Sequence, residues 1–175
     1  MATSIIQKKI CLLGDFSTGK TSLVRRFVYN VFDERYMSTL GVNISRKVVD
    51  LTAEQWVHLM IWDLSGNEKF DGARSEYIRG ASGALLVGDL SREDTLAKLP
   101  LFRDFFYETN PDVPIIVIGN KSDLVLENSE IIEQVHEVAR GFNVPCKITS
   151  AKTGDEVESA FSQLAQLLVN FHNES

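Results

Sequence analysis

A glycine-rich segment at residues 14–21, GDFSTGKT, contains the residue types that bind phosphate groups. It matches the pattern G-x-x-x-x-G-K-[ST], in which backbone N–H groups of the loop and of the following helix surround anionic oxygens. We expect the Lys20 ammonium to meet the outer phosphates and the Thr21 hydroxyl to bind Mg²⁺, a hard cation that prefers oxygen ligands. A glycine-rich turn without a ligand is the competing interpretation, which the strand–turn–helix setting disfavours. The motif predicts a nucleotide site but does not distinguish ATP from GTP.

Glycines at both ends of this loop, Gly14 and Gly19, allow the backbone to approach the phosphates closely. We therefore expect contacts to the nucleotide along the loop and at the start of the helix. The predicted contact residues are Asp15, Phe16, Ser17, Thr18, Gly19, Lys20, Thr21 and Ser22.

A second polar segment, residues 120–123 with the sequence NKSD, follows an apolar run that indicates a buried strand. Guanine presents N–H donors where adenine presents an acceptor, so the Asp123 carboxylate accepts both guanine donors but faces a lone pair on adenine. Buried polar pairing of this kind discriminates by about 10⁴–10⁵. An exposed polar turn is the alternative for this pattern alone, but its place downstream of the phosphate loop favours guanine. The predicted base-binding residues are Asn120, Lys121, Asp123, Leu124, Ser150, Ala151 and Lys152.

Three further positions predict ligands for the metal and the last phosphate. Asp63 ends a predicted strand opposite the phosphate loop, where a carboxylate holds the water shell of Mg²⁺. Gly66 lies three residues later, so its N–H is placed to reach a γ-phosphate. Thr39, in the polar segment between the first helix and the next strand, offers a second hydroxyl to Mg²⁺. A structural cap is the alternative for each residue alone. The predicted metal ligands are Thr21, Thr39 and Asp63.

The elements that must position these residues alternate between β-rich and helical patterns. The predicted strands are residues 9–14, 42–51, 55–63, 83–90, 113–119 and 145–149. The predicted helices are about 20–29, 93–109, 129–142 and 156–171, with Pro100 breaking or kinking the second of them. This alternation predicts a three-layer α/β sheet, mostly parallel, with one antiparallel hairpin. Because ligands bind at the carboxyl ends of such strands, the loops after residues 13, 62, 90, 119 and 149 should meet at one edge.

Length and charge limit the possible functions. The 175 residues suit one domain, residues 1–175. A net charge of −6 argues against sequence-independent nucleic-acid binding and against a polybasic membrane patch. Two cysteines in apolar stretches predict reduced, packed thiols. Residues 1–175 contain no signal-peptide pattern, no myristoylation site and no cysteine to prenylate near the last residue, so we expect a cytoplasmic monomer without a lipid anchor.

On these motifs the chain resembles the small GTPases of the Ras superfamily, and most closely the Rab family, over about residues 8–168. The Rab-like segments are residues 36–42, 59–63, 77–81 and 86–89. The resemblance implies a P-loop GTPase fold with a six-stranded, mostly parallel sheet, one antiparallel hairpin strand and about five helices. It also implies GTP/GDP and Mg²⁺ binding, with the γ-phosphate ordering two switch segments, residues 31–42 and 64–80. Effectors, exchange factors and activating proteins would read these segments together with Trp62.

The same resemblance assigns residues to hydrolysis and reveals two departures within the site. The implied catalytic residues are Asn67, Lys20, Gly66 and Thr39, and Tyr36 joins the nucleotide contacts. Asn67 stands where the family usually has the glutamine that orients the attacking water, and its side chain is one methylene shorter. Phe16 occupies a place in the phosphate loop where the family has a small residue. Either departure would weaken hydrolysis, although each is also compatible with ordinary drift of the loops.

Three functions remain as alternatives. The first is a molecular switch that hydrolyses GTP slowly, with Arg35 as a candidate source of positive charge in cis. The second is a GTP-binding interaction module with little or no hydrolysis, which Asn67 and Phe16 favour. The third is an ATP-dependent small-molecule kinase, which leaves residues 120–123 unexplained and is disfavoured.

Overall fold

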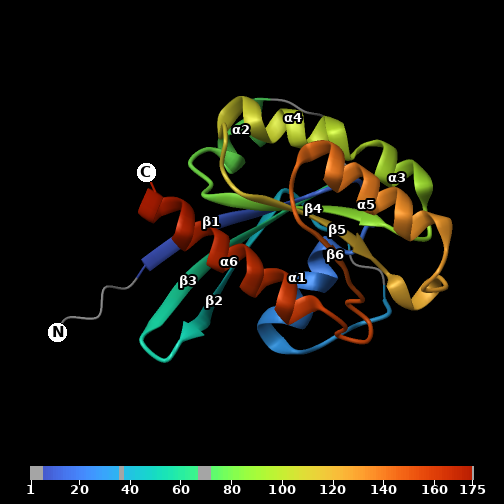
Figure 1. The fold of residues 1–175 in the computed structure, drawn as a ribbon, viewed down its shortest axis with the longest axis horizontal. Helices are drawn as coiled ribbons and strands as arrows, with labels where there is room; N and C mark the ends of the chain where they lie inside the picture. Colours follow the sequence, from blue (N-terminus) through green and yellow to red (C-terminus); the bar gives the residue numbers. More distant parts are fainter. Residues whose placement is uncertain (1–5, 36–37, 67–71, 175) are drawn as a thin grey trace.

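The computed structural model describes residues 6–35, 38–66 and 72–174, which form one six-stranded sheet with helices on both faces (Figure 1). The strands are β1 (Ile6–Leu13), β2 (Val42–Thr52), β3 (Gln55–Leu64), β4 (Gly83–Asp89), β5 (Ile115–Asn120) and β6 (Cys146–Ile148). The helices are α1 (Lys20–Tyr29), α2 (Gly72–Ile78), α3 (Glu93–Ala97), α4 (Leu99–Thr109), α5 (Glu130–Phe142) and α6 (Val157–Glu174), with a short 3₁₀ helix, η1 (Ser122–Leu124).

The strand order is β2-β3-β1-β4-β5-β6, and every neighbouring pair is parallel except the hairpin β2–β3. β1 therefore lies between β3 and β4, so the loop that follows it emerges where the strand order changes direction. A ligand is expected at such a point, outside the carboxyl ends of the strands. The predicted three-layer α/β architecture with one antiparallel strand pair is confirmed.

Alternating side chains on the strands build a core on each face of the sheet. Ile10 and Leu12 of β1 contribute to the cluster that packs under α1 and α6. Cys11 and Leu13 contribute to the cluster on the other face, under α2, α3, α4 and α5. Figure 1 shows the two helical layers on opposite sides of the sheet. Parallel strands covered on both faces explain why β4 and β5 are apolar throughout.

The predicted helix over residues 93–109 is interrupted, as expected. α3 ends at Ala97, α4 begins at Leu99, and Pro100 lies in the first turn of α4. A proline is tolerated there because the N–H that it lacks has no partner inside the helix at that position. With α3 and α4 counted as one interrupted helix, the described residues contain five α-helices, in agreement with the expectation.

Sequence patterning did not predict two short helical elements, α2 and η1, and it placed several element ends incorrectly. β1 begins at Ile6 rather than at residue 9, and β6 has three residues rather than five. Among the described residues, no helix combines the length and the apolar composition needed to cross a bilayer.

Candidate functional site

A cavity of about 420 Å³ opens at the carboxyl ends of the strands. This volume lies within the range of pockets that hold small ligands. Its walls come from the loops after β1, β3, β5 and β6 and from the segment between α1 and β2. The predicted site residues that line it are Phe16, Ser17, Gly19, Lys20, Thr21, Ser22, Thr39, Gly66, Asn120, Lys121, Asp123, Leu124, Ala151 and Lys152.

The remaining predicted residues lie behind this lining or outside the described part of the chain. The Thr18 side chain is fully buried and its hydroxyl donates to the Asp15 carbonyl at 3.1 Å. The Asp15 carboxylate is directed to Lys98 and does not line the cavity. Ser150 and Asp63 do not line the cavity but bind residues that do: Ser150 donates to Asp123, and Asp63 accepts from Thr21. Tyr36 and Asn67 lie outside the described residues.

Side-chain donors hold the backbone of the phosphate loop in place. The Lys20 ammonium donates to the carbonyl oxygens of Gly14 at 3.0 Å and of Asp15 at 2.8 Å. The Lys121 ammonium donates to Ser17 O at 2.9 Å, and Asn120 Nδ2 donates to Thr18 O at 3.0 Å. These carbonyls of the loop are therefore already paired, so the polar groups that the loop offers to a ligand are mainly N–H groups.

Two close approaches explain where the loop and its neighbour require glycine. A Cβ on Gly19 would lie 2.3 Å from Asn120 Nδ2, and its φ of 94° lies in the left-handed region. A Cβ on Gly66 would lie 2.5 Å from the backbone nitrogen of Phe16. The segment after β3 therefore crosses directly over the Asp15–Phe16 peptide, and a side chain there would force the two segments apart.

Lys20 gives the cavity a buried positive charge. Its side chain is buried, and burial lowers the pKa of the ammonium to about 8, with Asp63 opposing this shift and Arg74 adding to it. Its hydrogen bonds go to neutral carbonyls rather than to a carboxylate. An anion in the cavity would stabilise the charged form, because an opposite charge nearby offsets the cost of burial.

Three oxygen-bearing side chains meet beside Lys20. The hydroxyls of Thr21 and Thr39 lie 2.5 Å apart, and Thr21 donates to Asp63 Oδ2 at 2.6 Å. Asp63 is 2% exposed, and its Oδ1 has no hydrogen-bond partner among the described residues. Burial raises the pKa of this carboxyl, opposed by the Thr21 hydrogen bond and by Lys20.

This oxygen cluster fits Mg²⁺. The donors are hydroxyl and carboxylate oxygens, which the hard cation prefers, and the unpaired Asp63 Oδ1 supplies an anionic oxygen that lacks a partner. Within the described ranges, no group of three or more His, Cys, Asp or Glu side chains is placed to hold a metal ion. The remaining ligands of a cation at Thr21 and Thr39 would therefore be phosphate oxygens and water.

The opposite end of the cavity is built on Asn120, which is 1% exposed and joins three loops. Its Nδ2 donates to Thr18 O, while its Oδ1 accepts from the Thr149 hydroxyl at 3.1 Å and from the Ala151 N–H at 3.3 Å. Beside it, Asp123 Oδ1 accepts the Ser150 hydroxyl at 2.6 Å. The carboxylate of Asp123 is thereby oriented at the cavity wall.

Sequence reasoning missed three residues from other elements that shape the same cavity. Arg26 of α1 donates to the carbonyls of Ala151 at 2.9 Å and Lys152 at 2.5 Å. Phe32 lines the cavity and packs against the α1–α6 core. Arg92, at the start of α3, donates to Phe16 O at 2.8 Å. Arg26 and Arg92 belong to no local motif, and Phe32 lies in the predicted first switch segment without having been singled out as a site residue.

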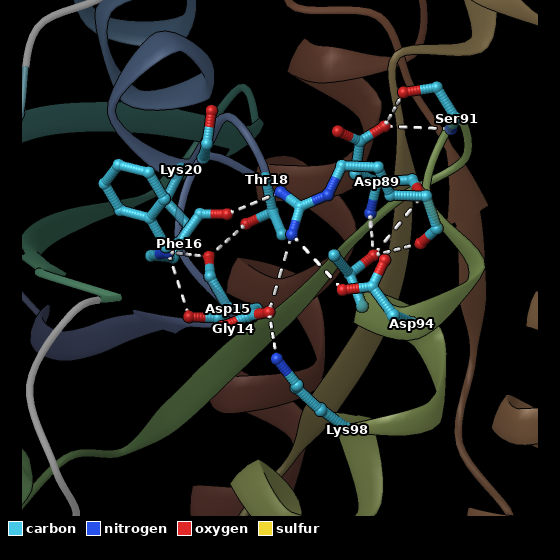
Figure 2. Close-up of polar contacts among 12 residues, drawn as sticks. Gly14, Asp15, Phe16, Thr18, Lys20, Asp89, Ser91, Asp94 and Lys98 are labelled. Atoms are coloured by element: carbon cyan, nitrogen blue, oxygen red, sulfur yellow. Dashed lines mark hydrogen bonds and ion pairs between the residues drawn. The ribbon is translucent and has the colours of Figure 1, made fainter.

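The loop after β4 meets the others at the same edge, but it approaches the phosphate loop from outside the cavity. Lys98 lies 2.6 Å from Asp15 Oδ2, and Figure 2 shows Lys98 and the ring of Phe16 on opposite sides of Asp15. Burial alone would raise the pKa of the Asp15 carboxyl. Hydrogen bonds from Lys98 and from the Phe16 N–H, with the charge of Arg92, outweigh burial and hold the pKa below its ordinary value.

Two ion pairs involve the segment between α1 and β2. Arg35 makes a two-point contact with Asp33 at 3.2 and 3.1 Å, although Arg35 is 88% exposed. Lys152 Nζ lies 3.1 Å from Glu34 Oε1 and links this segment to the loop after β6. Both pairs are exposed to solvent, so each contributes little to stability.

Comparison with known protein families agrees with this geometry. The model of the Ras family matches residues 9–170 of the chain, which includes every described residue that lines the cavity. A family match over nearly the whole chain, together with a phosphate loop of this sequence, identifies a P-loop, GTP-binding fold. The chain belongs to the Ras family of small GTPases.

Proposed function

We propose that this chain is a slow GTP hydrolase that binds GTP or GDP with Mg²⁺ and changes the conformation of two switch segments between the two states. One observation carries the proposal: Asp123 and the phosphate loop line a single cavity. Asn120 joins the phosphate loop to Ala151 in the loop after β6, and Ser150 of the same loop binds Asp123. A ligand that satisfies both ends must carry a base with paired N–H donors and a chain of phosphates. A guanine nucleotide has both.

The roles of the residues follow from their positions. The N–H groups of the loop and the Lys20 ammonium would hold the phosphates, and the N–H of Gly66, which also lines the cavity, would contact the γ-phosphate. Thr21, Thr39 and Asp63 would hold Mg²⁺, which neutralises the charge that develops on the phosphate oxygens. Loss of the γ-phosphate removes the contacts to Thr39 and Gly66, so these two positions connect hydrolysis to the switch segments.

The weakness of hydrolysis is the finer part of the proposal. Phe16 lines the cavity, and the start of the second switch segment at Gly66 lies against the backbone nitrogen of the same residue. A bulky residue this close to Gly66 would crowd a group that positions the attacking water. This observation favours the second candidate, a GTP-binding interaction module with little or no intrinsic hydrolysis.

The partners would be effectors, exchange factors and activating proteins that read residues 31–42 and 64–80. Leu40 is 88% exposed and Ile44, on the adjacent strand β2, is 50% exposed. Trp62 is paired with Ile44 across the hairpin, so these apolar side chains form a surface that a Rab-like effector would cover. We place the protein in the cytoplasm as a monomer that does not bind nucleic acid.

Two measurements test the proposal. Nucleotide extracted from purified protein is identified by chromatography, and a single-turnover hydrolysis rate with GTP and Mg²⁺ is then measured. GTP or GDP with measurable turnover supports the switch, and guanine nucleotide without turnover supports the interaction module. ATP or ADP in the extract would overturn both.

Arg35 lines the cavity at the first switch segment, where its guanidinium contacts Asp33. If Arg35 supplies positive charge during hydrolysis, Arg35→Ala lowers the intrinsic rate without changing GDP affinity. Equal rates for the wild type and Arg35→Ala would assign this arginine to the exposed ion pair alone.

A further inference from the structure

Five successive carbonyl groups of the phosphate loop, at residues 14–18, each accept a hydrogen bond from a side chain. Four of the five are held by residues of the recognised motifs. The middle one, Phe16 O, is held from outside them, by Arg92 Nη1 at 2.8 Å. Arg92 precedes the first residue of α3, on the side of the loop away from the cavity.

The geometry of the peptide unit gives this contact a consequence inside the cavity. In a planar trans peptide the C=O of one residue and the N–H of the next point in opposite directions. A hydrogen bond that pulls Phe16 O outward therefore turns the Ser17 N–H inward. Ser17 also has a φ of 62°, the left-handed conformation that non-glycine residues rarely adopt and that surrounding contacts must maintain.

Two cations hold the peptides on either side of Ser17: Arg92 binds Phe16 O and Lys121 binds Ser17 O. The buried carboxylate of Asp89 helps to position both cations. Asp89 is fully buried; its Oδ2 lies 2.7 Å from the Lys121 ammonium that binds Ser17 O. Figure 2 shows Asp89 Oδ1 accepting from the N–H of Ser91 at 2.9 Å and from the Ser91 hydroxyl at 2.6 Å. These two bonds fix the turn in which Arg92 follows Ser91.

Ionic contacts hold the Arg92 guanidinium in position. Its Nη2 lies 3.3 Å from Asp94 Oδ2 and 3.7 Å from Asp15 Oδ2, while Lys98 lies 2.6 Å from the same Asp15 oxygen. These groups are partly exposed, so the ion pairs mainly orient the side chain rather than stabilise the fold.

We propose that Arg92 is a positioning residue of the nucleotide site: through Phe16 O it fixes the Phe16–Ser17 peptide so that the Ser17 N–H faces the bound phosphates. The inference rests on the proposed function, because it assumes phosphates in the cavity. Arg92 itself touches no nucleotide; it acts through the loop backbone.

Arg92→Met keeps most of the side-chain stem and removes the donors. Losing a charge-assisted hydrogen bond at a partly exposed site should speed release of a fluorescent GDP analogue by about tenfold. Competition against that analogue should show that Arg92→Met loses less affinity for GMP than for GDP, because GMP has fewer phosphate oxygens to contact the loop. Arg92→Lys, which keeps one charged donor, should restore part of the affinity. Arg140→Met is the matched control, because Arg140 contacts Glu133 on the exposed side of α5.

A second readout is independent of turnover. In ¹H–¹⁵N spectra of the GDP-loaded protein, Arg92→Met should move the Ser17 amide resonance more than those of the other loop residues, while the thermal midpoint of Arg92→Lys stays near that of the wild type. The inference would be overturned if the wild type binds GDP and the Arg92 variants release it at the same rate as the wild type. That outcome would leave the proposed function intact. Equal losses for GDP and GMP would also overturn the inference. Wild-type protein that binds no guanine nucleotide would overturn the proposed function itself.

Discussion

The hydroxyl of Ser150 donates to Asp123 Oδ1 across 2.6 Å, joining the loop after β6 to η1 at the end of the cavity. Ser150 is 1% exposed, and its oxygen also accepts the Thr153 N–H at 3.1 Å. One carboxylate oxygen of Asp123 is therefore fixed by the protein before any ligand arrives. This leaves the second oxygen with a defined direction, which is the condition for reading a base edge.

Ser150→Ala should weaken GDP binding by about tenfold, because a hydrogen bond to a charged group is lost and the carboxylate becomes free to rotate. The dissociation constant is measured by titration with a fluorescent GDP analogue. Ser162→Ala, on the half-buried face of α6 away from the cavity, is the matched control. An affinity for GDP that is equal in Ser150→Ala and wild type would show that Asp123 needs no support from Ser150.

Asp63→Asn should uncouple nucleotide release from the metal. With Asp63 intact, chelation of Mg²⁺ by EDTA should speed GDP release at least tenfold, because a cation that bridges protein and phosphate is removed. The variant keeps the shape of the side chain but loses its charge, so its release should be fast with or without EDTA. Asp104→Asn, whose exposed carboxylate contacts Arg103 on α4, should respond to EDTA as the wild type does. If EDTA speeds GDP release from Asp63→Asn as much as from the wild type, the Asp63 carboxylate does not take part in binding the metal.

Asn67→Gln combined with Phe16→Ser should speed single-turnover GTP hydrolysis. The longer amide extends the reach to the attacking water, and the smaller residue frees the space beside Gly66. Measuring each single variant as well separates reach from crowding, since the two changes affect neighbouring groups and need not add. A double variant that hydrolyses at the wild-type rate or more slowly would contradict both explanations.

The thiols should be almost unreactive in the folded protein. Cys11 and Cys146 are free, and burial raises the pKa of each to about 12, slightly opposed at Cys11 by Lys9. Relative to a thiol with a pKa of 9.0, the thiolate fraction at pH 8 is about 10³-fold lower. Labelling with a chromogenic disulfide reagent at pH 8 should therefore be much slower in buffer than in denaturing urea, most clearly for the buried Cys11 and less so for the half-buried Cys146. Rapid labelling of Cys146 in buffer would contradict its burial.

The same shift gives the stability a defined pH dependence. An unfolded chain releases the thiol protons near pH 9, whereas the folded chain retains them until about pH 12. The folded state binds more protons in that interval, so the thiols lower the free energy of unfolding as pH rises from about 9 to 12. Urea unfolding at pH 8.5 and 10 should show this loss, and Cys146→Ala should reduce it.

The sequence was sufficient to predict the parts of the site that lie within continuous segments. Residues 14–21 and residues 120–123 each contain their polar groups within one short segment. Each segment directly follows a strand, so the local turn alone positions its side chains at the end of that strand. The break before α4 was also predictable, since Pro100 restricts the chain wherever it occurs. The three-layer, mostly parallel architecture followed from the alternation of strands with helices, whereas the strand order was known only from the structure.

The contacts missed by sequence reasoning all join distant segments. Arg92 lies 76 residues from Phe16, and Arg26 lies 125 residues from Ala151. The residues next to each arginine are no different from those around an arginine that only contacts solvent. Neither helical or strand periodicity nor motif spacing therefore identifies its partner. α2 was missed because its seven residues are too few for a clear helical period.

The pairing of β6 with β5 has a consequence for protein synthesis. Cys146, Lys147 and Ile148 pair with residues 117–119, and this pairing brings Ser150 to Asp123. Consider a nascent chain that has emerged from the ribosome only as far as α5. It contains the strands that precede the phosphate loop and Asp63, but not the loop after β6 that orients Asp123. Because chains emerge at about 5–20 residues per second, the segment after β6, which carries Ser150, emerges seconds after the segments that form the phosphate and metal ends.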